Sequence, residues 1–125
     1  MTPNTRSTRL SRGLAITGCV LLLVMAGIHG SGFFYVTDLM RQSDAPAFIQ
    51  DVFPVLFAHP SLHLAGLAIF GLLALRMPQE GYKVFFLAAT LVAVDSILAF
   101  ALGGIVPGFL LLTAAVLLFF AGRSS

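Results

Sequence analysis

Four side chains that can bind and release protons interrupt long uncharged stretches of this sequence. They are His29, His59, His63 and Asp95. An imidazole changes its charge near neutral pH, and a carboxyl group beside it can exchange a proton with it. If the four residues meet, they form a polar pocket that could act as a proton relay. We therefore take them as the candidate functional residues.

A metal site is a second interpretation of the same residues. His59 and His63 are four residues apart, so on an undistorted helix both rings project from one face. Imidazole suits zinc and copper, and His29 or Asp95 could complete a ligand shell. The HxxxH spacing lacks the glutamate of a metalloprotease motif, and Pro60 could rotate the two rings apart.

Haem binding and simple helix packing are further alternatives. Haem b needs two axial imidazoles from facing helices at one depth, which His29 and His63 could supply. A histidine near a helix end can instead bond a neighbouring carbonyl, and a protonated Asp95 can donate to one, so these residues could only hold helices together. We expect no cofactor, with haem, copper or zinc as the alternatives.

No motif in the sequence predicts catalysis or nucleic-acid binding. A GxSxG nucleophile motif, a phosphate-binding loop and paired catalytic carboxylates are all missing, so we expect no catalytic residues and a non-enzymatic protein. The seven Lys and Arg residues are scattered over loops and chain ends, without the basic patch typical of nucleic-acid-binding proteins.

Composition places these residues in a membrane protein. Residues of the apolar set make up 58% of the chain and charged residues 10%, against about 45–50% and about 25% in an average soluble domain. So few charges cannot cover a soluble surface, and most of the outer face must meet lipid.

The uncharged stretches predict an all-α fold, a single-domain bundle of four transmembrane helices within residues 1–125. A helix rises 1.5 Å per residue, so about 20 apolar residues cross the hydrocarbon core. Residues 1–12 are predicted to be a flexible cytoplasmic tail, and 46–53 a short interfacial helix or the first turns of the second span. Pro54 and Pro60 are expected to kink that span. The expected spans are 14–36, 52–75, 84–102 and 105–121.

Orientation follows from the basic residues. In a four-span topology, six of the seven fall on the side of the two termini and the second connection, and Arg41 falls on the other. By the positive-inside rule, both the N- and the C-terminus are expected to be cytoplasmic. The four titratable residues then lie roughly 3–9 Å to the outer side of the midplane. Because an isolated carboxylate there is costly, Asp95 is expected to be protonated or to face a histidine.

A loose resemblance covers nearly the whole chain. With Phe53 and Pro54 opening the second span, and with Gly66 and Asp95, the layout resembles several groups of small, uncharacterised bacterial four-helix inner-membrane proteins. The resemblance implies a multi-pass protein of the bacterial cell inner membrane and no particular activity.

The expected function is therefore open among several roles in the lipid bilayer. The leading interpretation is proton or small-solute handling, or an accessory subunit of a membrane complex. A metal- or haem-binding redox protein and a purely structural or assembly protein are the alternatives. Small-residue pairs such as Ala26 with Gly30 could join helices within one chain, in a homo-oligomer or with other membrane subunits, and so could Gly104 with Gly108.

Overall fold

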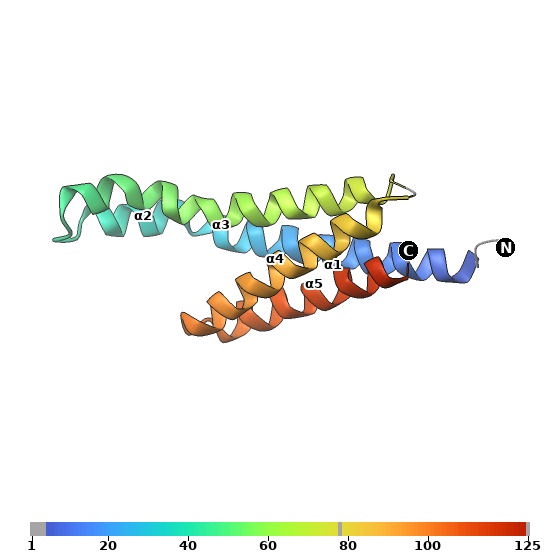
Figure 1. The fold of residues 1–125 in the computed structure, drawn as a ribbon. Coiled ribbons are helices and arrows are strands. Elements are labelled where there is room, and N and C mark those ends of the chain that lie inside the picture. Colours follow the sequence, from blue (N-terminus) through green and yellow to red (C-terminus); the bar gives the residue numbers. More distant parts are fainter. Residues whose placement is uncertain (1–4, 78, 125) are drawn as a thin grey trace.

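The computed structural model describes residues 5–77 and 79–124, and these form two antiparallel helical hairpins (Figure 1). The first hairpin pairs α1 and α2 with α3, and the second pairs α4 with α5. Four helical segments are long and apolar enough to cross a membrane, which confirms the predicted all-α fold with four candidate spans. The helices are α1 (Thr5–Ser31), α2 (Phe33–Arg41), α3 (Ala47–Ala74), α4 (Gly81–Ala101) and α5 (Ile105–Arg123).

The start of α1 differs from the sequence-based expectation, and the start of α3 agrees with one of its two alternatives. α1 begins at Thr5, inside the segment predicted to be a flexible tail; residues 1–4 lie outside the described residues. No Pro or Gly lies between Thr5 and Arg12, and the single Gly13 before the apolar stretch costs only about 1 kcal/mol, so the helix extends at low cost once formed. The segment 46–53 forms the first turns of α3, which begins at Ala47 and runs through both prolines without a break.

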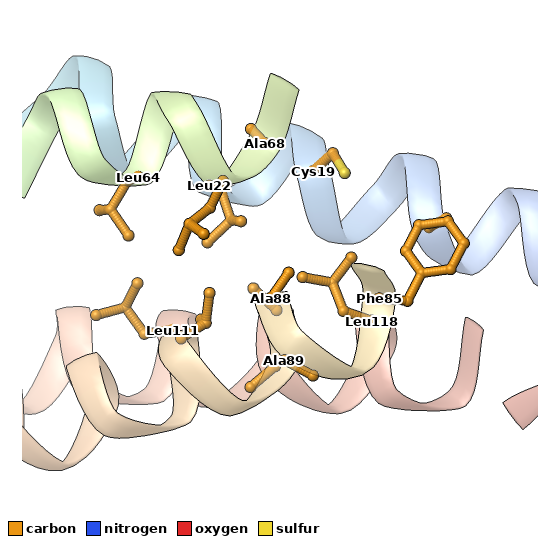
Figure 2. Packing of buried hydrophobic residues seen from close by; sticks show 14 of the residues in the cluster. Cys19, Leu22, Leu64, Ala68, Phe85, Ala88, Ala89, Leu111 and Leu118 are labelled. Carbon is orange, nitrogen blue, oxygen red and sulfur yellow. The ribbon is translucent and has the colours of Figure 1, made fainter. Parts of the chain in front are cut away.

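Small side chains bring α1, α3, α4 and α5 together in one core. In Figure 2, Leu22, Leu64 and Ala68 from the first hairpin face residues of the second, such as Leu111. Leu22 and Ala68 are fully buried. Between apolar helices in lipid, close packing rather than the hydrophobic effect supplies the attraction, and small residues permit the closest approach. The core is therefore stabilised by close packing of complementary helix surfaces.

The two ends of the bundle differ in what they carry. Ser11 Oγ donates a hydrogen bond to the carbonyl oxygen of Ala121 over 2.8 Å, which brings the two chain ends together at what we call the terminal end. The α3–α4 connection lies there too, whereas residues 42–46 and 102–104 form the opposite, loop end (Figure 1). Five basic residues lie at or near the terminal end: Arg9, Arg12, Arg76, Lys83 and Arg123.

The hairpins are unequal in length and separate towards the loop end (Figure 1). α4 and α5 have 21 and 19 residues, or about 32 and 29 Å, close to the thickness of a bilayer core. α3 has 28 residues, or about 42 Å. The first hairpin therefore extends past the second as an arm made of α2 and residues 47–56, with Phe34 and Tyr35 strongly exposed.

Both small-residue pairs of the sequence pack helices within the chain. Ala26 is buried in the core, and a Cβ on Gly30 would lie 3.4 Å from Ser61 Oγ of α3. A Cβ on Gly108 would lie 2.7 Å from the ring of Phe100, and Gly104 lies against Ala99 and Pro107. These glycines therefore serve the α1–α3 and α4–α5 contacts.

The closest approach of α1 to α3 provides a stability test. A Cβ on Gly71 would lie 2.5 Å from Cys19 Sγ, whereas a Cβ on Gly66 of the same helix would meet nothing within 4 Å. Gly71→Ala is expected to lower the free energy of unfolding in detergent by about 1–3 kcal/mol, because the helices must move apart. Gly66→Ala is the control and should be neutral or slightly stabilising. Cys19→Ala should relieve the effect of Gly71→Ala; equal losses in both glycine variants would contradict this packing.

Candidate functional site

One turn of α3 carries three polar residues, His59, Ser61 and His63, on two sides of the helix. Successive residues are about 100° apart, so Ser61 and His63 point about 200° apart. Ser61 faces α1 and His63 faces α4, as their contacts show. Pro60 lies between them inside a continuous helix. The same turn therefore contributes to two separate polar contacts.

The first contact joins α3 to α4. His63 Nε2 lies 3.2 Å from Asp95 Oδ2, and the side chains are 33% and 26% exposed. Although the residue is partly exposed, Oδ2 itself is covered, and it has no aligned hydrogen-bond donor among the described residues. The pair lies at ion-pair distance, and no hydrogen bond to Oδ2 is formed among the described residues.

His59 extends this contact towards the loop end. Its ring is stacked on that of His63, with centroids 6.2 Å apart and planes 18° from parallel. His59 is exposed and lies one helical turn nearer the loop end than His63. The three residues form a continuous series from the surface to the α3–α4 contact, which we call the His59–His63–Asp95 column.

His29 belongs to a different cluster. Its Nδ1 lies 3.0 Å from Ser61 Oγ, and its ring is stacked on Phe57 with centroids 4.5 Å apart. Because Ser61 and His63 face opposite sides of α3, the body of this helix separates His29 from the column. The structure thus brings three of the four candidate residues together and leaves His29 as a link between α1 and α3.

Sequence reasoning did not identify Ser61 and Phe57 as partners of His29. One signal was present: Ser61 is a polar residue in the same uncharged stretch as the two histidines. A serine there needs a hydrogen-bond partner in lipid, and His29 is one of few groups at its depth that can provide it. Aromatic stacking of Phe57 has no comparable sequence signal.

The column ends at an apolar core. Towards the loop end, Ser96 Oγ donates to the carbonyl oxygen of Gly108 over 2.8 Å. Its hydrogen is therefore not available to Asp95. Between Asp95 and the terminal end, the buried side chains packed in the core are apolar as far as Ser11. The main ones are Leu22, Leu67, Ala68, Phe85, Ala88, Val92 and Leu118. Among the described residues, polar groups therefore lie between the loop end and Asp95. From Asp95 towards the terminal end, the core contains no polar side chain for several helical turns.

The same geometry bears on metal and haem binding. Within residues 5–77 and 79–124, no three His, Cys, Asp or Glu side chains are grouped closely enough to hold a metal ion. A bis-histidine haem would need His29 and His63 on one side of α3, whereas they lie on opposite sides. The described side chains therefore form neither a three-residue metal shell nor a bis-histidine haem site.

Comparison with protein-family models, curated proteins and solved structures gives no match. The resemblance to small four-helix inner-membrane proteins therefore stays a prediction.

A double-mutant cycle tests the α3–α4 contact. His63→Ala and Asp95→Ala should each destabilise the protein, and the double variant should lose less than the sum, with a coupling of about 0.5–2 kcal/mol. The control cycle pairs His29→Ala with Asp95→Ala. Since α3 separates these two residues, their effects should add within about 0.5 kcal/mol. Unfolding titrations in detergent measure both cycles, and additivity of the His63 and Asp95 changes would contradict the contact.

Proposed function

We propose that this chain is a proton-binding, non-enzymatic protein of a bacterial cytoplasmic membrane. In this proposal, the His59–His63–Asp95 column binds protons from the side of the membrane that the loop end faces. The single observation that carries the proposal is the 3.2 Å contact between His63 Nε2 and Asp95 Oδ2 inside apolar candidate spans. Titratable groups in such segments are costly and mark proton or ion pathways in membrane proteins.

The chemistry of the pair suits a shared proton. Moving a proton between His63 Nε2 and Asp95 Oδ2 converts an ion pair into a neutral pair. The net charge is the same in both forms, so neither form leaves an isolated charge in the low-dielectric interior. The pair can therefore hold one proton in either form.

His59 provides the entrance in this proposal. Its ring is exposed and stacked on His63, and a neutral imidazole can accept a proton at one nitrogen and release one from the other. With ring centroids 6.2 Å apart, transfer to His63 needs a bridging water or a rotation of one ring. Proton uptake is therefore gated by small side-chain movements.

The apolar core beyond Asp95 makes this path one-sided. A proton that reaches Asp95 finds no polar group in the described core for several turns towards the terminal end, so it returns or is passed on after a rearrangement. This supports a protein that senses protons or donates them to a solute or a partner subunit. It does not support a passive proton channel.

The proposed orientation has the terminal end in the cytoplasm and the loop end outside. Five basic residues lie at or near the terminal end, where the positive-inside rule expects them. The arm and its 42–46 loop carry three aspartates and one arginine: Asp38, Asp44, Asp51 and Arg41. The column then takes its protons from the external side.

Infrared difference spectroscopy tests proton binding directly. Reconstituted protein should show a carboxylic-acid C=O band that grows as the external pH falls. Asp95→Asn should remove this component, because it removes the carboxyl group, and His63→Gln should shift it by replacing the neighbouring group. His29→Gln is the matched control, since His29 lies on the other side of α3, and should leave the band unchanged. A spectrum identical in Asp95→Asn and the original protein would overturn the proposal.

Thiol labelling in intact cells tests the orientation. Cysteines are introduced singly at Asp44 in the 42–46 loop and at Gln79 in the α3–α4 connection, in a Cys19→Ala background. A membrane-impermeant maleimide should label Asp44→Cys in intact cells and Gln79→Cys only after permeabilisation, because the two positions lie at opposite ends of the bundle. The reverse pattern would place the terminal end outside and the proton entrance in the cytoplasm.

A further inference from the structure

The column lies on a face of the molecule that no part of the described chain covers. His59 is exposed, and about a third of the His63 side chain and a quarter of the Asp95 side chain remain accessible. In a single chain within a bilayer, lipid would meet these polar groups, at a cost of several kcal/mol for an unpaired one. Another surface must therefore complete the site, or water must reach it.

The surroundings of the column are those of a helix–helix interface. Residues one or two turns away on the same faces of α3 and α4 are large, apolar and exposed. They are Leu56 and Phe70 on α3, and Leu91 and Leu98 on α4. A rim of this kind repels bulk water from the sides of the column. Polar groups surrounded by apolar side chains hold transmembrane helices together in protein complexes.

We propose that this face binds a second copy of the chain, so that two columns meet across a two-fold axis. In the orientation proposed above all copies point the same way, so a two-fold axis between them runs along the membrane normal. Such an axis brings together residues of equal depth. His63 and Asp95 have equal depth, because they touch each other. His63 of one protomer can therefore face Asp95 of its partner.

Complementarity of charge and hydrogen bonding favours a second copy over an unrelated partner. A two-fold interface uses one surface on both protomers, so that surface must complement itself. This one carries imidazole donors and a carboxylate acceptor on neighbouring helices, and parts of the His63 and Asp95 side chains stay accessible beside the covered Oδ2. The facing pair would give each carboxyl group a second imidazole. The apolar rims would cover both columns from lipid.

The dimer leaves the proton entrance open. His59 lies at the loop-end limit of the column, where α4 ends only six residues beyond Asp95, or about 9 Å. Covering the sides of the column therefore does not close its outer end. This inference rests on the proposed function, because it names the partner of the same site, but association and proton binding are measured separately.

Cysteine cross-linking in reconstituted membranes tests the interface. In a Cys19→Ala background, Leu98→Cys places a thiol beside the column, and Ile28→Cys places one on the exposed side of α1, with exposures of 55% and 60% for the original residues. The two positions lie at similar depth. A thiol-reactive cross-linker should trap a dimer through Leu98→Cys, with roughly tenfold less through Ile28→Cys. Equal yields at both positions would overturn the proposal.

The polar pair must contribute to the association for the proposal to hold. Adding Asp95→Asn to Leu98→Cys should weaken dimerisation by roughly three- to tenfold, whereas adding His29→Gln should leave it unchanged. Undiminished cross-linking with Asp95→Asn would show that two copies meet without the column. Sedimentation equilibrium of the unmodified chain in detergent should give the mass of two chains.

The two proposals fail in different ways. A monomer that keeps the pH-dependent carboxyl band of Asp95 would overturn the interface and leave the proton site. A dimer that depends on Asp95 but shows no such band would overturn the proton site and leave the interface.

Discussion

The cost of a carboxyl group inside a bilayer is the constraint on which the functional site of this protein depends. Asp95 interrupts a stretch without other charges, and an unpaired carboxylate there costs several kcal/mol. His63 on the neighbouring helix is its partner, with Nε2 3.2 Å from Asp95 Oδ2. This pairing adds to the apolar core packing and to the Ser11–Ala121 hydrogen bond, which also join the two hairpins. The residue that is hardest to accommodate in the membrane is also the one best placed to hold a proton.

Side chains on opposite sides of α3 make two different contacts within about one helical turn. Ser61 points to α1 and bonds His29, while His63 points to α4 and meets Asp95. Two residues of a helix correspond to about 200°, so these side chains cannot share a pocket. One histidine therefore holds α1 against α3, and the other two are left for the column. A rotation of α3 about its own axis, for example at Pro60, would alter the His29–Ser61 contact and the His63–Asp95 contact together.

Fold class and most of the candidate site follow from the sequence because they depend on short-range rules. Uncharged runs of about 20 residues predict the spans, and the i, i+4 spacing of His59 and His63 predicts that their rings share a face. The position of His29 could not be predicted, because counting depth gives the height of a residue and not its direction around the helix axis. Polar composition predicts a flexible tail up to Arg12, but Thr5–Arg12 contains no helix breaker, and α1 begins at Thr5.

In the proposed function, the unequal lengths of the hairpins place the column nearer the side of the membrane that the loop end faces. α4 continues only six residues beyond Asp95 towards the loop end but begins fourteen residues before it, which correspond to about 9 Å and about 21 Å. A polar side chain placed at Asp95 therefore lies near one surface and far from the other. The stacked imidazole of His59 covers much of the shorter distance, whereas apolar core fills the longer one. The short second hairpin thus makes the site one-sided before any side-chain chemistry is considered, and a proton bound there can cross the membrane only if α3 and α4 move.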